Sequence, residues 1–352
     1  MEEVFTPLVL LPQRLPDWFR RNLRELPWRQ DREPYHVWLS EIMLQQTRVE
    51  AVKGYYTRFL AALPTIEALA QVPEPQLLKL WEGLGYYNRA RNLQKAAQVI
   101  LSEHHGVFPR DYDAIRALPG IGDYTAGAIS SICFEARTPA VDGNVLRVVS
   151  RVCDYYGCTD EPREKKRITE ALAEIYPETA GDFTQALMEL GAMVCVPNGA
   201  PLCEKCPMGD ACLARQRGTV DELPVRKAKK PRRQEDMTVF LLTCGDQIAL
   251  RKRPDTGLLA GLYEFPHVSG TLSAQEIIAQ TEAWGLAPKY LEKLVSRRHI
   301  FTHIQWNMTG ARLHCGRENS AFIWADRAAI GREYALPTAF RQFLPDLSPG
   351  SP

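Results

Sequence analysis

The sequence predicts an all-helical domain followed by a smaller α+β domain, and three observations support this division. Up to about residue 216, apolar residues recur every three or four positions, which is the spacing of amphipathic helices. Beyond residue 237 the pattern changes to short runs rich in β-branched and aromatic residues, as in strands. Between the two regions lies a basic, proline-containing stretch, Arg226–Arg233, which predicts an extended linker over residues 217–236. The second domain is expected to span residues 237–346.

Glycine and proline punctuate the helical region and separate its expected helices. These helices are Val37–Tyr55, Glu74–Leu80, Asn88–Ser102, Tyr124–Phe134, Val145–Tyr156, Arg163–Ile175 and Gly181–Met193. In the second region a Gly245-Asp246 turn between two strand-like runs predicts a β-hairpin. The expected strands are Thr238–Thr243, Ile248–Lys252, Leu294–His299, Ile304–Met308 and Ala311–Cys315, with helices at Gln275–Trp284 and Thr338–Phe343.

Composition and the N-terminal residues predict a cytoplasmic protein. The chain has 352 residues, of which 45% are hydrophobic, so it can build two cores, while its net charge of +1 says little about partners. The first twenty residues start acidic and contain Pro7 and Pro12, unlike a secretory signal. No run approaches the roughly 18 apolar residues of a membrane helix, so no membrane partner is expected. The odd count of nine cysteines suits a reducing compartment.

Four of the cysteines, Cys195, Cys203, Cys206 and Cys212, are grouped within a short stretch and predict a metal centre. Their successive intervals are seven, two and five residues, with a single C-x-x-C step that is followed by proline. Structural zinc sites usually combine two close ligand pairs, so this spacing favours an iron–sulfur cluster, with zinc as the alternative. The other cysteines are interpreted as small buried apolar side chains. They are Cys133, Cys153, Cys158, Cys244 and Cys315.

The segment Leu118–Ala126, which reads LPGIGDYTA, lies between two helical patterns and predicts a helix–hairpin–helix motif. Gly120 and Gly122 permit a tight turn and leave bare backbone amides at the start of the second helix. Amides in this position bind phosphate, so the motif is typical of contact with a DNA backbone. A plain helix–helix turn is the alternative.

Two carboxylates have ordinary structural explanations when each is considered alone. Glu41 lies in an amphipathic helix beside Trp38 and Gln45, where a glutamate is usually inert. Asp142 precedes an apolar helix and can act as its N-cap, and Asn144 can be a turn residue.

Taken together, these segments resemble the MutY adenine DNA glycosylases, which belong to the helix–hairpin–helix, iron–sulfur glycosylase superfamily of endonuclease III. The resemblance covers nearly the whole helical region in the same order. It rests on Trp38–Thr47 (WLSEIMLQQT), Gly83–Asn92 (GLGYYNRARN), the hairpin, Val141–Val145 (VDGNV) and the cysteine loop 195–212. It implies that residues 1–216 form a DNA glycosylase domain that contains one [4Fe-4S] cluster held by the four grouped cysteines.

The resemblance implies removal of adenine mispaired with 8-oxoguanine or guanine in double-stranded DNA, which leaves an abasic site in base excision repair. The target base leaves the helix stack before its glycosidic bond can be reached. Glu41 then serves as a general acid with a raised pKa, while an ionised Asp142 stabilises the positive charge on the sugar. Tyr124 and Asn144 orient these carboxylates and water. A monomer in the bacterial cytosol, associated with the nucleoid when bound to DNA, is expected.

Several residues match positions that contact DNA in this family or distinguish its branches. Gln46 and Tyr86 match positions that wedge into the base stack beside the oxidised guanine. Relatives that also cut the backbone carry a lysine at the position of Tyr124, and some have another at Leu146, so a monofunctional glycosylase is expected. The first cysteine interval is seven residues where six is usual, and Val196–Leu202 contains no lysine or arginine.

The downstream domain resembles Nudix folds through Thr256–Pro266 (TGLLAGLYEFP). Its expected helix, Gln275–Trp284, offers only Glu276 and Glu282, too few acids for the metal site of a Nudix hydrolase, so no pyrophosphatase activity is expected. The segment Phe301-Thr302-His303 matches a Phe-Ser-His turn that touches 8-oxoguanine in the family; a strand-end aromatic with a surface histidine is the alternative. The basic linker either attracts DNA phosphates or serves as a solubilising tether.

Three other functions remain as alternatives. An endonuclease III-like pyrimidine glycosylase with lyase activity is disfavoured by Tyr124 and by the appended domain. A non-catalytic DNA-binding or redox-sensing module has no need of both Glu41 and Asp142. A Nudix hydrolase lacks the acidic helix.

Overall fold

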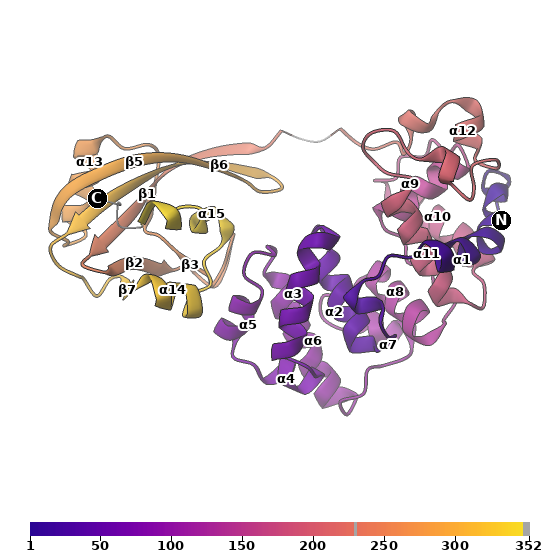
Figure 1. Cartoon of the computed structure of the whole chain (residues 1–352), viewed down its shortest axis with the longest axis horizontal. Coiled ribbons are helices and arrows are strands. Elements are labelled where there is room, and N and C mark those ends of the chain that lie inside the picture. Colours follow the sequence, from indigo (N-terminus) through magenta and orange to yellow (C-terminus); the bar gives the residue numbers. More distant parts are fainter. Residues whose placement is uncertain (229–230, 348–352) are drawn as a thin grey trace. The chain divides into compact units, whose positions relative to one another are not determined.

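The computed structural model describes residues 1–228 and 231–347, which form two compact units (Figure 1). The first unit comprises Met1–Gln71 and Arg91–Ala228. The second comprises Val72–Ala90 together with the chain from Lys229 onward. The chain therefore enters the second unit twice, and its last crossing falls inside the predicted basic linker. Two residues of that linker, Lys229 and Lys230, lie outside the described residues.

The first unit is helical, which confirms the predicted fold class of the upstream region. A 3-10 helix at Glu3–Leu10 precedes its α-helices. These are α1 (Leu11–Asn22), α2 (Pro34–Leu44), α3 (Val49–Ala62), α4 (Ile66–Gln71), α6 (Asn88–Glu103), α7 (Tyr112–Ala117), α8 (Asp123–Phe134), α9 (Gly143–Val152), α10 (Pro162–Ile175), α11 (Ala180–Met193) and α12 (Leu213–Arg217). Helix α6 begins in the second unit and continues into the first.

The expected single helix Val37–Tyr55 is wrong, because the structure divides it into α2 and α3. Helix α2 ends at Leu44, and Gln46 adopts a left-handed backbone conformation with φ of 57°. The amide of Thr47 donates to the carbonyl of Leu44 at 3.2 Å and closes a turn before α3 begins at Val49. The break bends the chain at Gln45–Thr47, and these residues line the cavity described below.

The core of the first unit surrounds α9 and α11. Every residue of α9 from Val145 to Val152 is buried, and α11 packs against α1, α8 and α9. Phe183 and Leu187 of α11 contact this core with almost no solvent exposure. Because both helices are enclosed, the residues at the N-terminus of α9 are held in fixed positions.

The second unit contains a mixed sheet, which confirms the predicted change of fold class. Within the described residues its strands follow the order β3-β2-β1-β6-β5; β4 pairs with β1, and β7 with β2. Strands β1 and β6 run parallel, and the other pairs are antiparallel. The strands are β1 (Arg233–Cys244), β2 (Gln247–Lys252), β3 (Tyr263–Glu264), β4 (His267–Ser269), β5 (Pro288–Ile300), β6 (Ile304–Cys315) and β7 (Ile323–Ala325). Cys244 pairs with Gln247 across the Gly245-Asp246 turn, as the sequence predicted.

The two strands expected at Ile304–Met308 and Ala311–Cys315 are instead one continuous strand, β6. Gly310 lies within this strand opposite Val295 and makes no turn. A Cβ at Gly310 would lie 2.5 Å from the ring of Phe343, so the glycine allows the ring to pack directly on the strand. The glycine therefore reports close packing and not a chain reversal.

Helices cover both faces of the sheet. Val239 and Leu241 of β1 point to one face and share a core with Phe340, whereas Phe240 and Leu242 point to the other and share a core with Ile277. This alternation explains why the consecutive residues Val239–Leu242 of β1 are all apolar. The helices of the unit are α5 (Glu74–Leu80), α13 (Ala274–Ala283), α14 (Arg327–Glu333) and α15 (Thr338–Arg341).

Among the described residues, none of the helices combines the length and the apolar character that a bilayer crossing requires.

Candidate active site and cysteine pocket

Glu41 and Asp142 line the same cavity in the first unit, which has a volume of about 600 Å³. Glu41 projects from the middle of α2, and Asp142 is the N-cap of α9. Tyr124 of α8 and Asn144 of α9 also line this cavity. The fold thus brings together the four polar side chains to which the family resemblance assigns catalytic roles.

Tyr124 is the hydrogen-bond partner of Glu41, since its hydroxyl donates to Oε2 of the carboxyl at 2.7 Å. Glu41 is only 7% exposed. Burial raises the pKa of Glu41 to about 7; the Tyr124 hydrogen bond lowers it, and the nearby charge of Asp142 raises it. A carboxyl group with this pKa is partly protonated at neutral pH and can donate a proton.

Asp142 receives three hydrogen bonds that fix its orientation. Oδ1 accepts from the backbone amides of Asn144 and Val145, each at 2.8 Å, as in an N-cap. Oδ2 accepts from the side-chain amide of Asn144, also at 2.8 Å. Burial raises the pKa of Asp142, while these donors act in the opposite direction and favour its ionised form. The structural role as N-cap and the position in the cavity coexist.

Arg147 connects Asn144 to the cysteine loop. One of its terminal nitrogens, Nη2, donates to Oδ1 of Asn144 at 2.9 Å and to the carbonyl of Gly191 at 2.8 Å. Its Nε donates to the carbonyl of Cys195 at 2.7 Å. Because Asn144 accepts from Arg147, its NH₂ group must face Asp142. A Cβ at Gly191 would lie 2.6 Å from Cβ of Asn144, so α11 approaches closely here only because this residue is glycine.

The sequence interpretation missed a buried ion pair at the wall of the cavity. Glu189 of α11 is fully buried, and its two carboxylate oxygens accept from Arg24 at 2.7 and 2.8 Å. Arg29 adds a further bond at 2.8 Å. Burial acts to raise the pKa of Glu189, but these arginine hydrogen bonds outweigh it and lower the pKa to about 2. The available signal was one glutamate between the apolar residues Met188 and Leu190.

The predicted hairpin lies between α7 and α8. Gly120 has φ of 78°, and a Cβ there would lie 2.6 Å from Cβ of Asn92. Gly122 is the N-cap of α8 with an extended backbone, and no atom lies within 4 Å of a Cβ placed on it. The first glycine is therefore required by the turn, while the second leaves the amides of α8 open to a ligand. Gln46, another predicted DNA-contact residue, lines the same cavity as Glu41 and Asp142.

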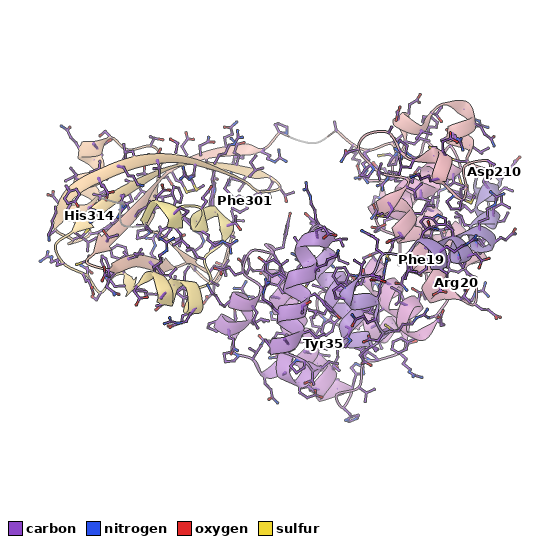
Figure 2. All side chains as sticks on the ribbon, viewed as in Figure 1. Phe19, Arg20, Tyr35, Asp210, Phe301 and His314 are labelled. Carbon is purple, nitrogen blue, oxygen red and sulfur yellow. The ribbon has the colours of Figure 1, made fainter. Side chains whose placement is uncertain are left out.

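The predicted DNA-contact residues Tyr86, Phe301, Thr302 and His303 all lie in the second unit. Phe301-Thr302-His303 forms the turn between β5 and β6, which the amide of Phe301 closes by donating to the carbonyl of Ile304 at 2.8 Å. The hydroxyl groups of Tyr86 and Thr302 are 2.5 Å apart and hydrogen-bonded. Figure 2 labels Phe301 at the end of this long hairpin. Thr302 and His303 are exposed, so the turn is accessible.

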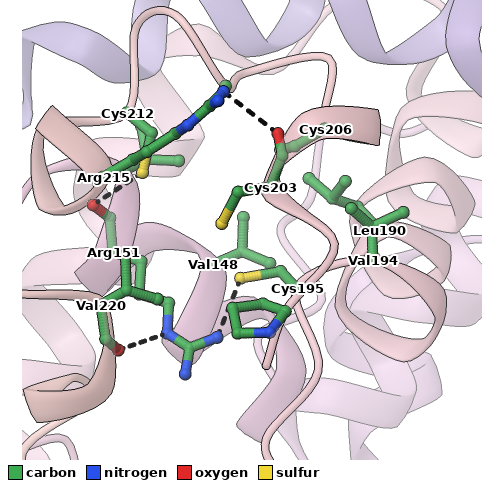
Figure 3. Close-up of a pocket in the computed structure, with 13 residues that line it drawn as sticks. Val148, Arg151, Leu190, Val194, Cys195, Cys203, Cys206, Cys212, Arg215 and Val220 are labelled. Carbon is green, nitrogen blue, oxygen red and sulfur yellow. Dashed lines mark hydrogen bonds between the residues drawn. The ribbon is translucent and has the colours of Figure 1, made fainter. Parts of the chain in front are cut away.

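The four grouped cysteines line one pocket, which the sequence predicted from their spacing alone (Figure 3). Nη1 of Arg151 donates to Sγ of Cys195 at 3.4 Å, and its Nε donates to the carbonyl of Val220 at 3.0 Å. The amide of Leu202 donates to the carbonyl of Val194 at 2.9 Å, which closes the long first interval into a loop. Over residues 1–228 and 231–347, no three histidine, cysteine, aspartate or glutamate side chains group closely enough to hold one metal ion. Four thiols around one pocket are nevertheless the donor set of a larger iron–sulfur cluster.

Comparison with known proteins links both units to described families. Residues 39–178 match the family described as HhH-GPD superfamily base excision DNA repair protein. Residues 238–346 match the family described as NUDIX domain. A solved structure of a thermostable thymine-DNA glycosylase is similar to 60% of this chain and 97% of that protein, with 30% sequence identity and a TM-score of 0.53.

Two curated relatives extend this similarity over most of the chain. The adenine DNA glycosylase of Homo sapiens is 36% identical over 353 residues, which cover 83% of this chain and 64% of the human protein. The adenine DNA glycosylase of Buchnera aphidicola is 32% identical over 302 residues, covering 85% of this chain and 83% of that protein. The matched region thus spans less than two thirds of the human relative and most of the bacterial one.

Proposed function

The chain belongs to the adenine DNA glycosylase family of base excision repair, and from this premise we propose that it excises adenine mispaired with 8-oxoguanine or guanine in duplex DNA. The observation that carries the proposal is the placement of Glu41 and Asp142 in one cavity. A pair of carboxyl groups, one able to donate a proton and one surrounded by hydrogen-bond donors, fits the hydrolysis of a glycosidic bond.

The proposed reaction begins when adenine leaves the base stack and enters the cavity. Adenine is a poor leaving group unless its ring is protonated. Glu41 is the candidate proton donor, because its pKa of about 7 keeps it partly protonated near neutral pH. Tyr124 holds the carboxyl by its hydrogen bond to Oε2. After the bond breaks, the ionised Glu41 can accept a proton from the attacking water.

Asp142 is proposed to stabilise the positive charge that develops on the sugar. The two backbone amides and the Asn144 side chain hold its carboxylate in one orientation. Arg147 in turn fixes the orientation of Asn144. An ionised, immobile carboxylate requires no rearrangement when the cationic transition state forms, which is how an active site lowers a barrier electrostatically.

We propose a monofunctional glycosylase, since the positions where bifunctional relatives carry a lysine are occupied by Tyr124 and Leu146. A phenol and an alkyl chain cannot form a Schiff base with the sugar.

The Nudix-like domain is proposed to recognise 8-oxoguanine through the turn Phe301-Thr302-His303. Glu276 in α13 accepts from Ser273 in a capping box, so this acid has a structural role.

One [4Fe-4S] cluster is proposed at Cys195, Cys203, Cys206 and Cys212. Such a cluster would cross-link the loop between α11 and α12 and supplies no proton or nucleophile. The chain's own Arg147 and Arg151 hold the carbonyl and sulfur of Cys195 respectively. DNA is the proposed macromolecular partner, a monomer the proposed assembly state, and a cytoplasmic location remains a prediction.

A cleavage assay on defined duplexes tests the proposed function. Wild-type protein is incubated with a duplex that carries adenine opposite 8-oxoguanine, and strand breaks are measured with and without hot alkali. We expect breaks only after alkali, because a monofunctional enzyme leaves an abasic site in an intact strand. Duplexes with adenine opposite guanine and with thymine opposite guanine are run in parallel. Breaks without alkali would indicate a lyase, excision of thymine a different specificity, and no product a binding protein.

A further inference from the structure

The segment Val72–Ala90 packs with the Nudix-like region in one compact unit, although more than a hundred residues separate the two in the sequence. The contact centres on Lys79, near the end of α5. Its ammonium group donates to Oε2 of Glu82 at 2.8 Å and to the carbonyls of Ile330 and Tyr334 at 3.2 and 3.0 Å. All three of its hydrogens therefore have acceptors. The two carbonyls belong to the C-terminal turn of α14, where a cation is favourable.

Glu82 makes the second half of the contact. Its Oε2 binds Lys79, and its Oε1 accepts from the backbone amide of Leu336 at 2.7 Å. The guanidinium of Arg341 lies 4.0 Å from the same carboxylate. The side chains of Lys79 and Glu82 are only 18% and 13% exposed. This is a mostly buried, fully hydrogen-bonded ion pair, unlike the exposed pairs that contribute little.

A short, rigid turn connects this ion pair to Tyr86. The indole nitrogen of Trp81 donates to the carbonyl of Gly85 at 3.1 Å. Nη2 of Arg89 donates to the carbonyls of Leu84 and Gly85 at 3.0 and 3.2 Å. Tyr86 itself has φ of 47°, an uncommon conformation for a non-glycine residue, which this cage of bonds holds.

At the far end of the turn, Tyr86 meets the β5–β6 hairpin through its hydrogen bond to Thr302. One of these hydroxyl groups donates its hydrogen to the other, so the bond joins the two side chains directly. Two attachments, one at Lys79–Glu82 and one at Tyr86–Thr302, place the turn against the Nudix-like region. Displacing the first attachment would move Tyr86 relative to Thr302.

We propose that Lys79 and Glu82 are positioning residues that hold Tyr86 and Thr302 together as one composite reader of the base opposite the target adenine. The inference rests on the proposed function and assigns its discrimination of 8-oxoguanine from guanine to a structure built from both stretches of the second unit. Neither Lys79 nor Glu82 touches the base; each acts through the geometry of the turn.

The test compares Lys79→Met with wild type by single-turnover excision of adenine opposite 8-oxoguanine and opposite guanine. We expect the ratio of the two rates to fall by about tenfold, because a small displacement of a recognition group costs at least this much. Glu82→Gln, which keeps an acceptor for the Leu336 amide, should lower the ratio less. Thr302→Ala and the double variant Lys79→Met/Thr302→Ala should have the same ratio of rates. Both variants lack the Tyr86–Thr302 hydrogen bond, so the loss of Lys79 has nothing further to disrupt.

Lys166→Met is the matched control, because Lys166 forms an exposed ion pair with Glu170 on α10. It removes the same charge and should leave the ratio unchanged. Melting temperatures of all variants identify any global loss of folding. An unchanged ratio in a folded Lys79→Met protein overturns the inference while the proposed function stands, as does an additive double variant. Loss of adenine excision by the wild type instead overturns the proposed function.

Discussion

At the scale of single residues, the candidate proton donor Glu41 carries a cost in stability, because its carboxyl group is buried. Trp38 and Met43, in the same helix, are almost fully buried, and Glu41 lies among such residues with one hydrogen bond from Tyr124. A carboxyl group in these surroundings is more stable protonated than ionised, which raises its pKa to about 7, chiefly through burial. The burial that raises the pKa of Glu41, and so suits it to the proposed role of proton donor, also makes the protein less stable when Glu41 is ionised.

We predict that Glu41→Gln abolishes adenine excision and stabilises the protein at alkaline pH. The pKa of Glu41 is 4.5 in the unfolded chain and is raised to about 7 in the folded protein. Between these two pH values the folded protein therefore binds more protons than the unfolded chain. Its contribution to stability is full below pH 4.5 and is lost as the pH rises through 7. Glutamine has no such loss, and the gain at pH 8 should be about 1–3 kcal/mol. Denaturant unfolding of both proteins at pH 5 and pH 8 measures it.

The excision rate of the wild type should also fall as the pH rises above about 7, because the proton that Glu41 is proposed to donate is lost there. Single-turnover rates across this range report the group in the bound complex. A rate that does not change between pH 6 and 9 would assign the proton donor to another residue.

The sequence alone could not identify Glu41 as special, since a glutamate on an amphipathic helix is ordinarily exposed. Only the resemblance singled it out, and the structure then placed it beside Tyr124 and Asp142. Neither the sequence pattern nor the resemblance identified Glu189. Its role depends on ion pairs with Arg24 and Arg29, which lie more than 150 residues earlier in the chain. Charge pairs between distant segments leave no local pattern to read.

At the scale of elements, the sequence predicted helices and strands well where periodicity was long. It failed where a residue other than glycine or proline reverses the chain, as at Gln46, which breaks the expected helix Val37–Tyr55. It also failed where glycine serves packing, as at Gly310 beneath the ring of Phe343. Tertiary contacts decide both cases, and single-sequence propensity does not contain them.

The hairpin permits a paired test of what its two glycines do. Gly120→Ala should destabilise the protein by about 1–3 kcal/mol, because the left-handed backbone and the neighbouring Asn92 both oppose a Cβ. Gly122→Ala should change stability by less than about 0.5 kcal/mol, since its surroundings are open. If the amides at α8 bind phosphate, Gly122→Ala should still weaken duplex binding. Chemical denaturation and a duplex titration separate the two effects; equal stabilities would refute the packing argument.

At the scale of the whole molecule, the polypeptide passes twice through its second unit and keeps both its cavity and its cysteine pocket in the first. A division of the chain by composition yields domains that are each one continuous segment. It could therefore not predict that Val72–Ala90 packs with the C-terminal region. The change of fold class and the grouping of the four thiols were predictable, because spacing and periodicity are local properties of the chain.

Purified protein should contain about four iron atoms per chain if the proposed cluster is present. Cys206→Ser should lose iron and lower the melting temperature, since its thiol lines the pocket. Cys158→Ser should keep both, because Cys158 is not among the residues that line it. Elemental analysis and thermal unfolding measure the outcome. Stoichiometric zinc in place of iron would favour the alternative metal.

The returning path of the chain also sets an order of events during synthesis on the ribosome. The acceptors of Lys79 at Ile330 and Tyr334 are 251 and 255 residues downstream. While the first unit's helices emerge and can begin to pack, Lys79 lacks these two acceptors until Ile330 and Tyr334 have been synthesised. Until then, a nascent protein has α5 without its contacts to the C-terminal region. A chain that terminates before Ile330 would never form these contacts.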